Sequence, residues 1–205
     1  LTEPNGLVAI GGDLSATRLL SAYKQGIFPW FSEGEPIMWW SPSPRMVLFP
    51  NELKISNSLK KTLKKQPFEV RFNTSFNAVM TACSNTIRLD ENNNPAGTWI
   101  SPKMIEAYCE LNRLGYAICM ESWINNTLVG GCYGIKIGHM FYGESMFHHV
   151  TDASKVAFSH LVQHLLEQGV EMIDCQMKTP LLTSFGGREI PRDEFMRQLL
   201  KMIEF

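Results

Sequence analysis

Two short turns in the second half of the chain constrain the fold most. Asn125–Asn126 and Gly138–His139 separate three apolar segments, 117–123, 128–137 and 140–146. Apolar segments joined by two-residue turns rich in Asn and Gly are typical of antiparallel β-hairpins. The sequence therefore predicts three consecutive, hairpin-linked strands.

Helices flank these strands. One helix is expected from Ser101, which can cap its N-terminus, to Gly115, which ends it. A second is expected over 152–167, followed by a strand at 172–175 and a closing helix over 192–203. The order helix–β–β–β–helix–β–helix is an α+β pattern, and it resembles the core of the N-acetyltransferase superfamily.

The first half of the chain is less regular. Ser15 can cap a helix that Gly26 ends. From Gly26 to Arg45, prolines and glycines exclude long regular elements, yet the segment is rich in Phe and Trp. An aromatic-rich loop either packs on the core or lines a pocket. The other elements expected here are strands over 46–49 and 68–72 and helices over 56–65 and 75–84.

A length of 205 residues allows one large domain or two small ones. We expect a small N-terminal α/β domain over residues 1–66, which holds the aromatic loop and a basic helix. The N-acetyltransferase-like catalytic domain would then occupy residues 67–205.

Composition excludes several classes of protein. Nineteen basic and twenty acidic residues give a net charge of −1, so any nucleic-acid contact must depend on a local patch. The five cysteines are odd in number and form no CxxC pair, which favours reduced thiols over disulfides or zinc. No apolar run approaches the ~20 residues that span a bilayer, and no signal peptide is visible. We expect a cytoplasmic protein with no membrane association.

Three polar residues near strand ends could carry chemistry. Glu144 ends an apolar strand and could bind an ammonium group or move a proton; an exposed strand-end carboxylate is the alternative. Asp174 lies inside an apolar strand, where a charge must be paired or hydrogen-bonded. Because Asp174 and Gln176 are two residues apart on a strand, both side chains are expected on one face. Asp174 could orient the Gln176 amide, or it could be a buried structural residue.

Metal and nucleotide motifs are absent from the sequence. His160 and His164 have helical i,i+4 spacing but lack the Glu of HExxH, and Cys175 is better explained as a core residue. No nucleotide-binding glycine loop and no pyrophosphate turn for acetyl-CoA is found, so we expect neither a metal nor a cofactor. A run of lysines without nearby acids is a candidate for binding phosphates, with a solvated helix surface as the alternative. The four lysines are Lys60, Lys61, Lys64 and Lys65.

Several unusual segments, in order along nearly the whole chain, resemble the leucyl/phenylalanyl-tRNA–protein transferase family. They are EPNGLVAIGGDLS (3–15), YKQGIFPWF (23–31), MWWSPSPR (38–45), GTWI (97–100), LVGGCYG (128–134), FYGESMF (141–147), ASKVAF (153–158), IDCQ (173–176) and REIPR (188–192). The family transfers Leu or Phe, and less readily Met, from aminoacyl-tRNA to the N-terminal Arg or Lys of proteins. This transfer tags them for degradation by the bacterial N-degron route. The resemblance also implies a smaller N-terminal domain followed by an N-acetyltransferase-like domain.

The resemblance implies roles for individual residues. Asp174 would polarise Gln176 to help deprotonate the attacking amine, or substrate positioning would suffice, with the proton passed within the tRNA or through water. Glu144 would hold the α-amino group of the donor. The remaining roles fall into three groups. The donor side-chain pocket would comprise Cys132, Phe141, Met146, Phe158 and Ile173; the terminal adenosine would contact Tyr23, Trp30 and Trp99; the tRNA backbone would contact Arg45, Lys60, Lys61, Lys64 and Lys65.

Three departures from the family pattern stand out. Cys132 occupies a position where Met is expected, the loop from Thr86 to Asn94 is longer, and Leu181 or Leu182 replaces a His. Other tRNA-dependent aminoacyl transferases, a non-catalytic RNA-binding module and an acyl-CoA acetyltransferase are the rival functions. The expected partners are aminoacyl-tRNA and proteins or peptides with N-terminal Arg or Lys, and a monomer is expected.

Overall fold

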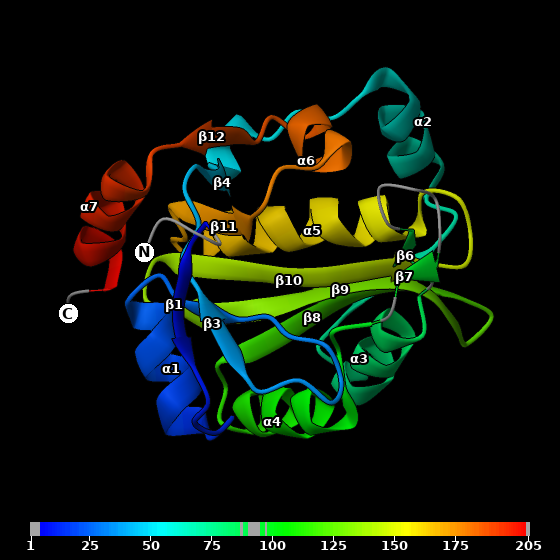
Figure 1. Ribbon diagram of the computed structural model, residues 1–205. Coiled ribbons are helices and arrows are strands. Elements are labelled where there is room, and N and C mark those ends of the chain that lie inside the picture. Colours follow the sequence, from blue (N-terminus) through cyan, green and yellow to red (C-terminus); the bar gives the residue numbers. More distant parts are fainter. Residues whose placement is uncertain (1–4, 87, 90–94, 97, 204–205) are drawn as a thin grey trace.

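A seven-stranded mixed sheet forms the centre of the protein in the computed structural model, which describes residues 5–86, 88–89, 95–96 and 98–203 (Figure 1). The strand order is β12-β4-β11-β10-β9-β8-β5. The strands are β4 (Arg45–Leu48), β5 (Glu69–Phe72), β8 (Ala117–Ile124), β9 (Thr127–Ile137), β10 (Met140–His148), β11 (Met172–Gln176) and β12 (Arg188–Ile190). Neighbours pair antiparallel except β10 and β11, which pair parallel. The three predicted hairpin-linked strands are therefore confirmed as β8, β9 and β10.

Helices cover both faces of this sheet. The helices of the described residues are α1 (Ala16–Lys24), η1 (Pro50–Glu52), α2 (Asn57–Lys65), α3 (Phe76–Ser84), α4 (Pro102–Arg113), α5 (Ala153–Glu167), α6 (Pro180–Ser184) and α7 (Arg192–Ile203). Helices α3 and α4 lie on one face and α5 lies on the other (Figure 1). Each face carries its own cluster of buried apolar side chains. Within the described ranges, no helix combines the length and apolar character needed to cross a bilayer.

Local capping explains where three of the helices begin. The hydroxyl of Ser15 accepts a hydrogen bond from the backbone N–H of Arg18, and the hydroxyl of Ser56 accepts one from that of Leu59. Ser101 caps α4 in the same way. Each cap satisfies a backbone donor that the first helical turn leaves unpaired. The predicted starts of these helices are confirmed.

The aromatic loop is more ordered than the sequence indicated. A three-stranded sheet forms there, with the order β1 (Leu7–Ile10), β3 (Met38–Trp40), β2 (Phe28–Pro29). The indole N–H of Trp39 donates to the Gly11 carbonyl oxygen at 2.9 Å, and that of Trp40 donates to the Trp30 carbonyl oxygen at 2.7 Å. A further short pair joins β6 (Arg88–Leu89) to β7 (Pro95–Ala96); residues 90–94 of the longer loop lie outside the described residues.

Strand β4 connects the two halves of the chain. It lies between β11 and β12 in the large sheet, although it precedes residue 66. The expected division between residues 66 and 67 therefore does not coincide with a boundary of the sheet. The result is a mixed α/β architecture in which the N-terminal segment supplies one strand to the sheet that carries the candidate site.

Candidate active site

The candidate site forms where two neighbouring strands separate. Parallel pairing of β10 with β11 joins Phe141 to Ile173 and then Tyr142 to Asp174. Directly after this point the register of β10 shifts at Glu144, and that of β11 shifts between Asp174 and Gln176. Bulges bend a strand and increase its twist, so two of them side by side open the sheet at this position.

A pocket of about 680 Å³ occupies this opening. Its apolar part includes all five residues expected to hold the donor side chain. They are Cys132, Phe141, Met146, Phe158 and Ile173. Glu144 and Gln176 also line the pocket, as do Trp30 and Trp99. The structure thus gathers at one cavity residues that come from six separated segments of the chain.

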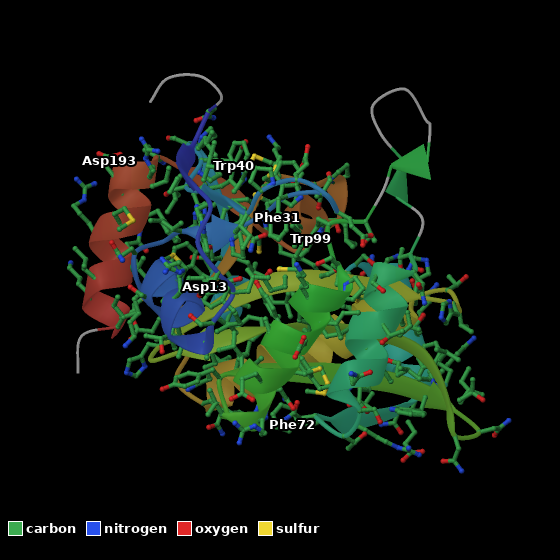
Figure 2. The ribbon with its side chains drawn as sticks, turned by 60° about the horizontal axis from the view of Figure 1, so that its bottom comes forward. Asp13, Phe31, Trp40, Phe72, Trp99 and Asp193 are labelled. Atoms are coloured by element: carbon green, nitrogen blue, oxygen red, sulfur yellow. The ribbon has the colours of Figure 1, made fainter. Side chains whose placement is uncertain are left out.

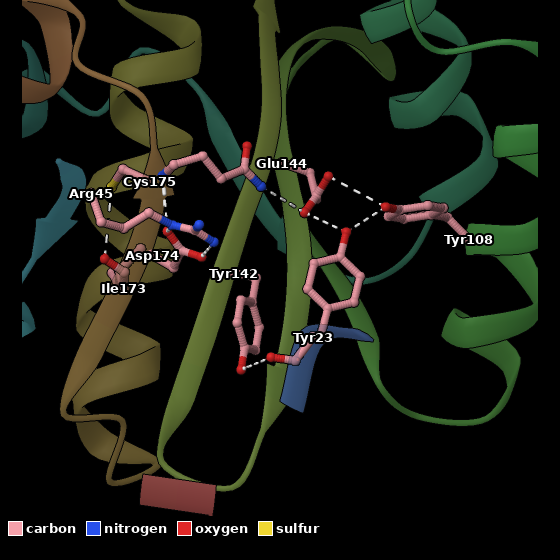
Figure 3. A network of polar contacts seen from close by, with 9 residues as sticks. Tyr23, Arg45, Tyr108, Tyr142, Glu144, Ile173, Asp174 and Cys175 are labelled. Atoms are coloured by element: carbon pink, nitrogen blue, oxygen red, sulfur yellow. Dashed lines mark hydrogen bonds and ion pairs between the residues drawn. The ribbon is translucent and has the colours of Figure 1, made fainter. Parts of the chain in front are cut away.

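Glu144 accepts hydrogen bonds from three side chains (Figure 3). Its Oε1 accepts from the Tyr23 hydroxyl at 2.7 Å and from Nε2 of Gln176 at 3.0 Å. Its Oε2 lies 3.4 Å from the Tyr108 hydroxyl, which is also hydrogen-bonded to the hydroxyl of Tyr23. These contacts hold the carboxylate in one orientation at the pocket wall.

Burial controls the protonation of this group. Removal from water raises the pKa of Glu144 from 4.5 to about 7, although the hydrogen bonds from Tyr23 and Gln176 oppose the rise. Burial also raises the pKa values of Tyr23 and Tyr108 well above 10. The two phenols therefore stay protonated and act as donors, whereas Glu144 changes charge near neutral pH. A carboxyl group of this kind can bind an ammonium group or exchange a proton.

Asp174 lies beneath the pocket and pairs with Arg45. Nε and Nη2 of Arg45 donate to the two carboxylate oxygens at 2.8 and 2.7 Å, and both side chains are fully buried. The guanidinium lies between the rings of Phe28 and Phe195, 4.8 and 4.7 Å from their centroids. Arg45 was expected to contact the tRNA backbone, but its complete burial does not fit that role.

Gln176 is positioned through its backbone. Its N–H donates to Oδ1 of Asp174 at 2.9 Å, while its side-chain amide donates to Glu144. Its φ of 63° is in the left-handed region, which non-glycine residues rarely adopt. The sequence left open whether Asp174 orients the Gln176 amide, accepts a hydrogen bond from it, or is a buried structural residue; in the structure its carboxylate accepts from the main-chain N–H of Gln176, from which that amide projects. Asp174 can therefore be a buried structural residue and also position Gln176.

The three residues expected around the adenosine differ in accessibility. Trp30 is 43% exposed and Trp99 is half-buried at the pocket. Figure 2 shows Trp99 on the same side of the molecule as Phe31 and Trp40. Tyr23 is fully buried, with its ring 4.9 Å from that of Tyr142, so it offers no open face for an adenine. Its hydroxyl instead donates a hydrogen bond to Glu144.

The remaining candidates lie elsewhere. Lys60, Lys61, Lys64 and Lys65 are exposed on α2, and none of them forms an ion pair with a carboxylate of the described chain. Burial raises the pKa of the Cys175 thiol, which disfavours the nucleophilic thiolate. The ring of His164 packs against that of Phe72 in a tilted arrangement, with centroids 4.3 Å apart. Sequence reasoning missed Tyr108, because nothing in its spacing on α4 points to a strand 36 residues away.

Comparison with known proteins decides the family. Residues 47–200 match the family model described as leucyl/phenylalanyl-tRNA protein transferase, and residues 12–43 match the model of its N-terminal domain. The chain belongs to this family.

Relatives within the leucyl/phenylalanyl-tRNA–protein transferase family match over nearly the whole chain. The protein of that name from Nitrosospira multiformis is 54% identical over 205 residues, which is 100% of this chain and 86% of the relative. The one from Chromobacterium violaceum is 56% identical over 199 residues, or 97% of this chain and 83% of the relative. A solved structure described as L-PGS from Bacillus licheniformis overlays with a TM-score of 0.49 and 8% identity, covering 92% of this chain and 70% of that one.

Proposed function

We propose that the pocket binds the aminoacyl end of a charged tRNA and that its rim hosts peptide-bond formation. As a member of the leucyl/phenylalanyl-tRNA–protein transferase family, the protein is an aminoacyltransferase that takes Leu or Phe from tRNA. We further propose that Met is a poorer donor and that the acceptors are proteins with N-terminal Arg or Lys, which the transfer tags for degradation. The joining of an apolar cavity to Glu144 and Gln176 carries this proposal.

The donor side chain would occupy the apolar part of the cavity. About 680 Å³ lies within the roughly 300–1,000 Å³ typical of small-molecule sites, so an amino acid and part of an adenosine can be accommodated. Phe141 and Ile173 form paired positions of the sheet, and Phe158 faces the same cluster from α5. An apolar wall of this kind discriminates weakly between side chains of similar size, which suits acceptance of both Leu and Phe.

The polar groups would orient the rest of the donor. Ionised Glu144 attracts the donor α-ammonium group, and Trp30 and Trp99 offer aromatic surfaces for the terminal adenine. The lysines of α2 would bind phosphates of the acceptor stem, because α2 and α6 lie along the same edge of the molecule (Figure 1). Contacts of this type read backbone position rather than sequence.

In the proposed reaction, the α-amine of the acceptor attacks the carbonyl carbon of the aminoacyl ester. A C–N bond forms, the ester C–O bond breaks, and the terminal ribose oxygen leaves with the proton that the amine loses. Gln176 donates its amide N–H to Glu144, so its carbonyl oxygen is left to accept a hydrogen bond from the attacking amine. Positioning of the two reactants is the contribution that this geometry supports best, since an amide is a poor base.

The wider architecture is consistent with an N-acetyltransferase-like fold. The observation that supports this assignment is a mixed sheet whose parallel strands, β10 and β11, diverge at the pocket. We also propose that the N-terminal segment and the catalytic segment act as two domains that share β4. We also propose that the protein acts as a monomer, and that a charged-tRNA donor places the reaction in the cytoplasm.

The test is transfer of labelled Leu from Leu-tRNA to peptides that begin with Arg, Lys, Ala or acetylated Arg. Transfer to free Arg and Lys alone is expected, with loss of transfer in Gln176→Ala. Charged tRNA that binds without any transfer would indicate an RNA-binding module. Transfer to the Ala peptide would indicate a different acceptor class.

A further inference from the structure

The REIPR segment has no role in the proposed donor site, yet its acidic residue lies beside the pocket. Glu144 and Lys178 are the only charged side chains among the described residues that line the pocket. Nζ of Lys178 lies 3.0 Å from Oε2 of Glu189, on the edge strand β12. Since Glu144 already serves the donor, a cationic acceptor needs a second carboxylate.

We propose that Glu189 recognises the basic side chain of the acceptor's first residue. In the free enzyme, the Lys178 ammonium group occupies the position that this basic side chain would take. This inference rests on the proposed function. The acceptor's guanidinium or ammonium group would displace the Lys178 ammonium from Glu189. Lys178 would then turn outward to solvent, which already reaches 59% of its side chain.

The register of the sheet gives this residue a suitable distance from the reaction. Gln176 of β11 and Glu189 of β12 both pair with Met46 of β4, from opposite sides. Neighbouring strands lie about 4.8 Å apart, so the Cα atoms of the two residues are about 10 Å apart. An extended arginine separates its α-nitrogen from its guanidinium by roughly 7 Å, and a glutamate side chain reaches a few ångströms more. An acceptor whose first residue has a short side chain would not reach Glu189 while its α-amine lies beside Gln176.

The strength of the existing pair allows the exchange. The side chains of Lys178 and Glu189 are 59% and 35% exposed, and ion pairs this exposed contribute only about 0–1 kcal/mol. An arginine can replace one such contact with two parallel hydrogen bonds, whereas lysine provides one. The site would therefore accept both residues and bind arginine more tightly.

The proposal predicts opposite effects for the two members of the pair. Glu189→Gln should raise the KM for an Arg peptide about tenfold, because it removes one charge-assisted hydrogen bond and a bond of this kind contributes about a factor of ten in affinity. Lys178→Met should lower the same KM, because it removes the competing cation. A peptide that begins with citrulline, the uncharged analogue of arginine, should be a poor acceptor for the wild type, and Glu189→Gln should erase the difference. The KM for Leu-tRNA should stay unchanged in Glu189→Gln, because Glu189 does not line the donor pocket.

Glu110→Gln, which breaks an exposed ion pair with Arg113 on α4, is the matched control and should leave both KM values unchanged. Equal increases of the acceptor KM in Glu189→Gln and Lys178→Met would show that the pair is only structural and overturn the proposal. Unaltered discrimination between Arg and citrulline in Glu189→Gln would also overturn it. Absence of transfer by the wild type would instead refute the proposed function.

Discussion

Replacing Glu144 with glutamine should make the protein more resistant to unfolding as the pH rises. The folded structure raises the pKa of Glu144 from 4.5 to about 7 through burial. Between these two pH values the native state binds a proton that the unfolded state has lost. Native stability must therefore fall as the pH rises through this window, and glutamine removes that dependence.

The size of the effect follows from the pKa difference. At about 1.4 kcal/mol per tenfold change, a rise from 4.5 to about 7 corresponds to at most about 3–4 kcal/mol. Glu144 lines an open pocket, where water reduces the penalty, so about 2 kcal/mol is expected. For a chain of 205 residues, each kcal/mol shifts Tm by about 2–4 °C. The Tm of Glu144→Gln minus the Tm of the wild type should thus be about 4–8 °C larger at pH 8 than at pH 4.

Thermal unfolding of wild type and variant at half-unit pH steps measures this difference. Glu52→Gln is the control with the opposite sign, because hydrogen bonding to Arg188 lowers the pKa of Glu52. The Tm of Glu52→Gln should lie below that of the wild type near neutral pH, and this difference should disappear on acidification. A pH-independent difference for Glu144→Gln would refute the assignment of a desolvated carboxyl group. Loss of transfer activity together with a gain in stability would indicate that this residue is retained for function.

Three further outcomes follow from the same geometry. Arg45→Met should lower the free energy of unfolding in urea by about 3–5 kcal/mol, because it leaves Asp174 charged and unpaired; adding Asp174→Asn should recover most of the loss, whereas additive losses would contradict the pairing. Met146→Ala should raise the KM for Leu-tRNA and spare the acceptor KM in steady-state assays, and the reverse pattern would rule out the pocket assignment. Charge reversal of Lys61 and Lys64 together should weaken tRNA binding in filter assays and flatten its salt dependence; unchanged affinity would exclude contact with phosphates.

Much of the fold was predictable because its signals are local. Ser15, Ser56 and Ser101 mark helix starts within one turn of the residues they cap. The two turns between β8, β9 and β10 likewise need only a few neighbouring residues. The short strands around the aromatic loop were not predicted, because β1 and β2 are held by pairing with β3 rather than by their own sequences.

The sequence by itself determined the helices, the hairpins, the family resemblance and the residue types that line the donor pocket. Only the tertiary structure decided how the polar residues work together. Two adjacent bulges turn Glu144 and Gln176 toward each other. Arg45 and Asp174, 129 residues apart, become a buried pair rather than a surface contact. Such contacts join distant segments, and both burial and the pKa of about 7 for Glu144 depend on everything packed around them.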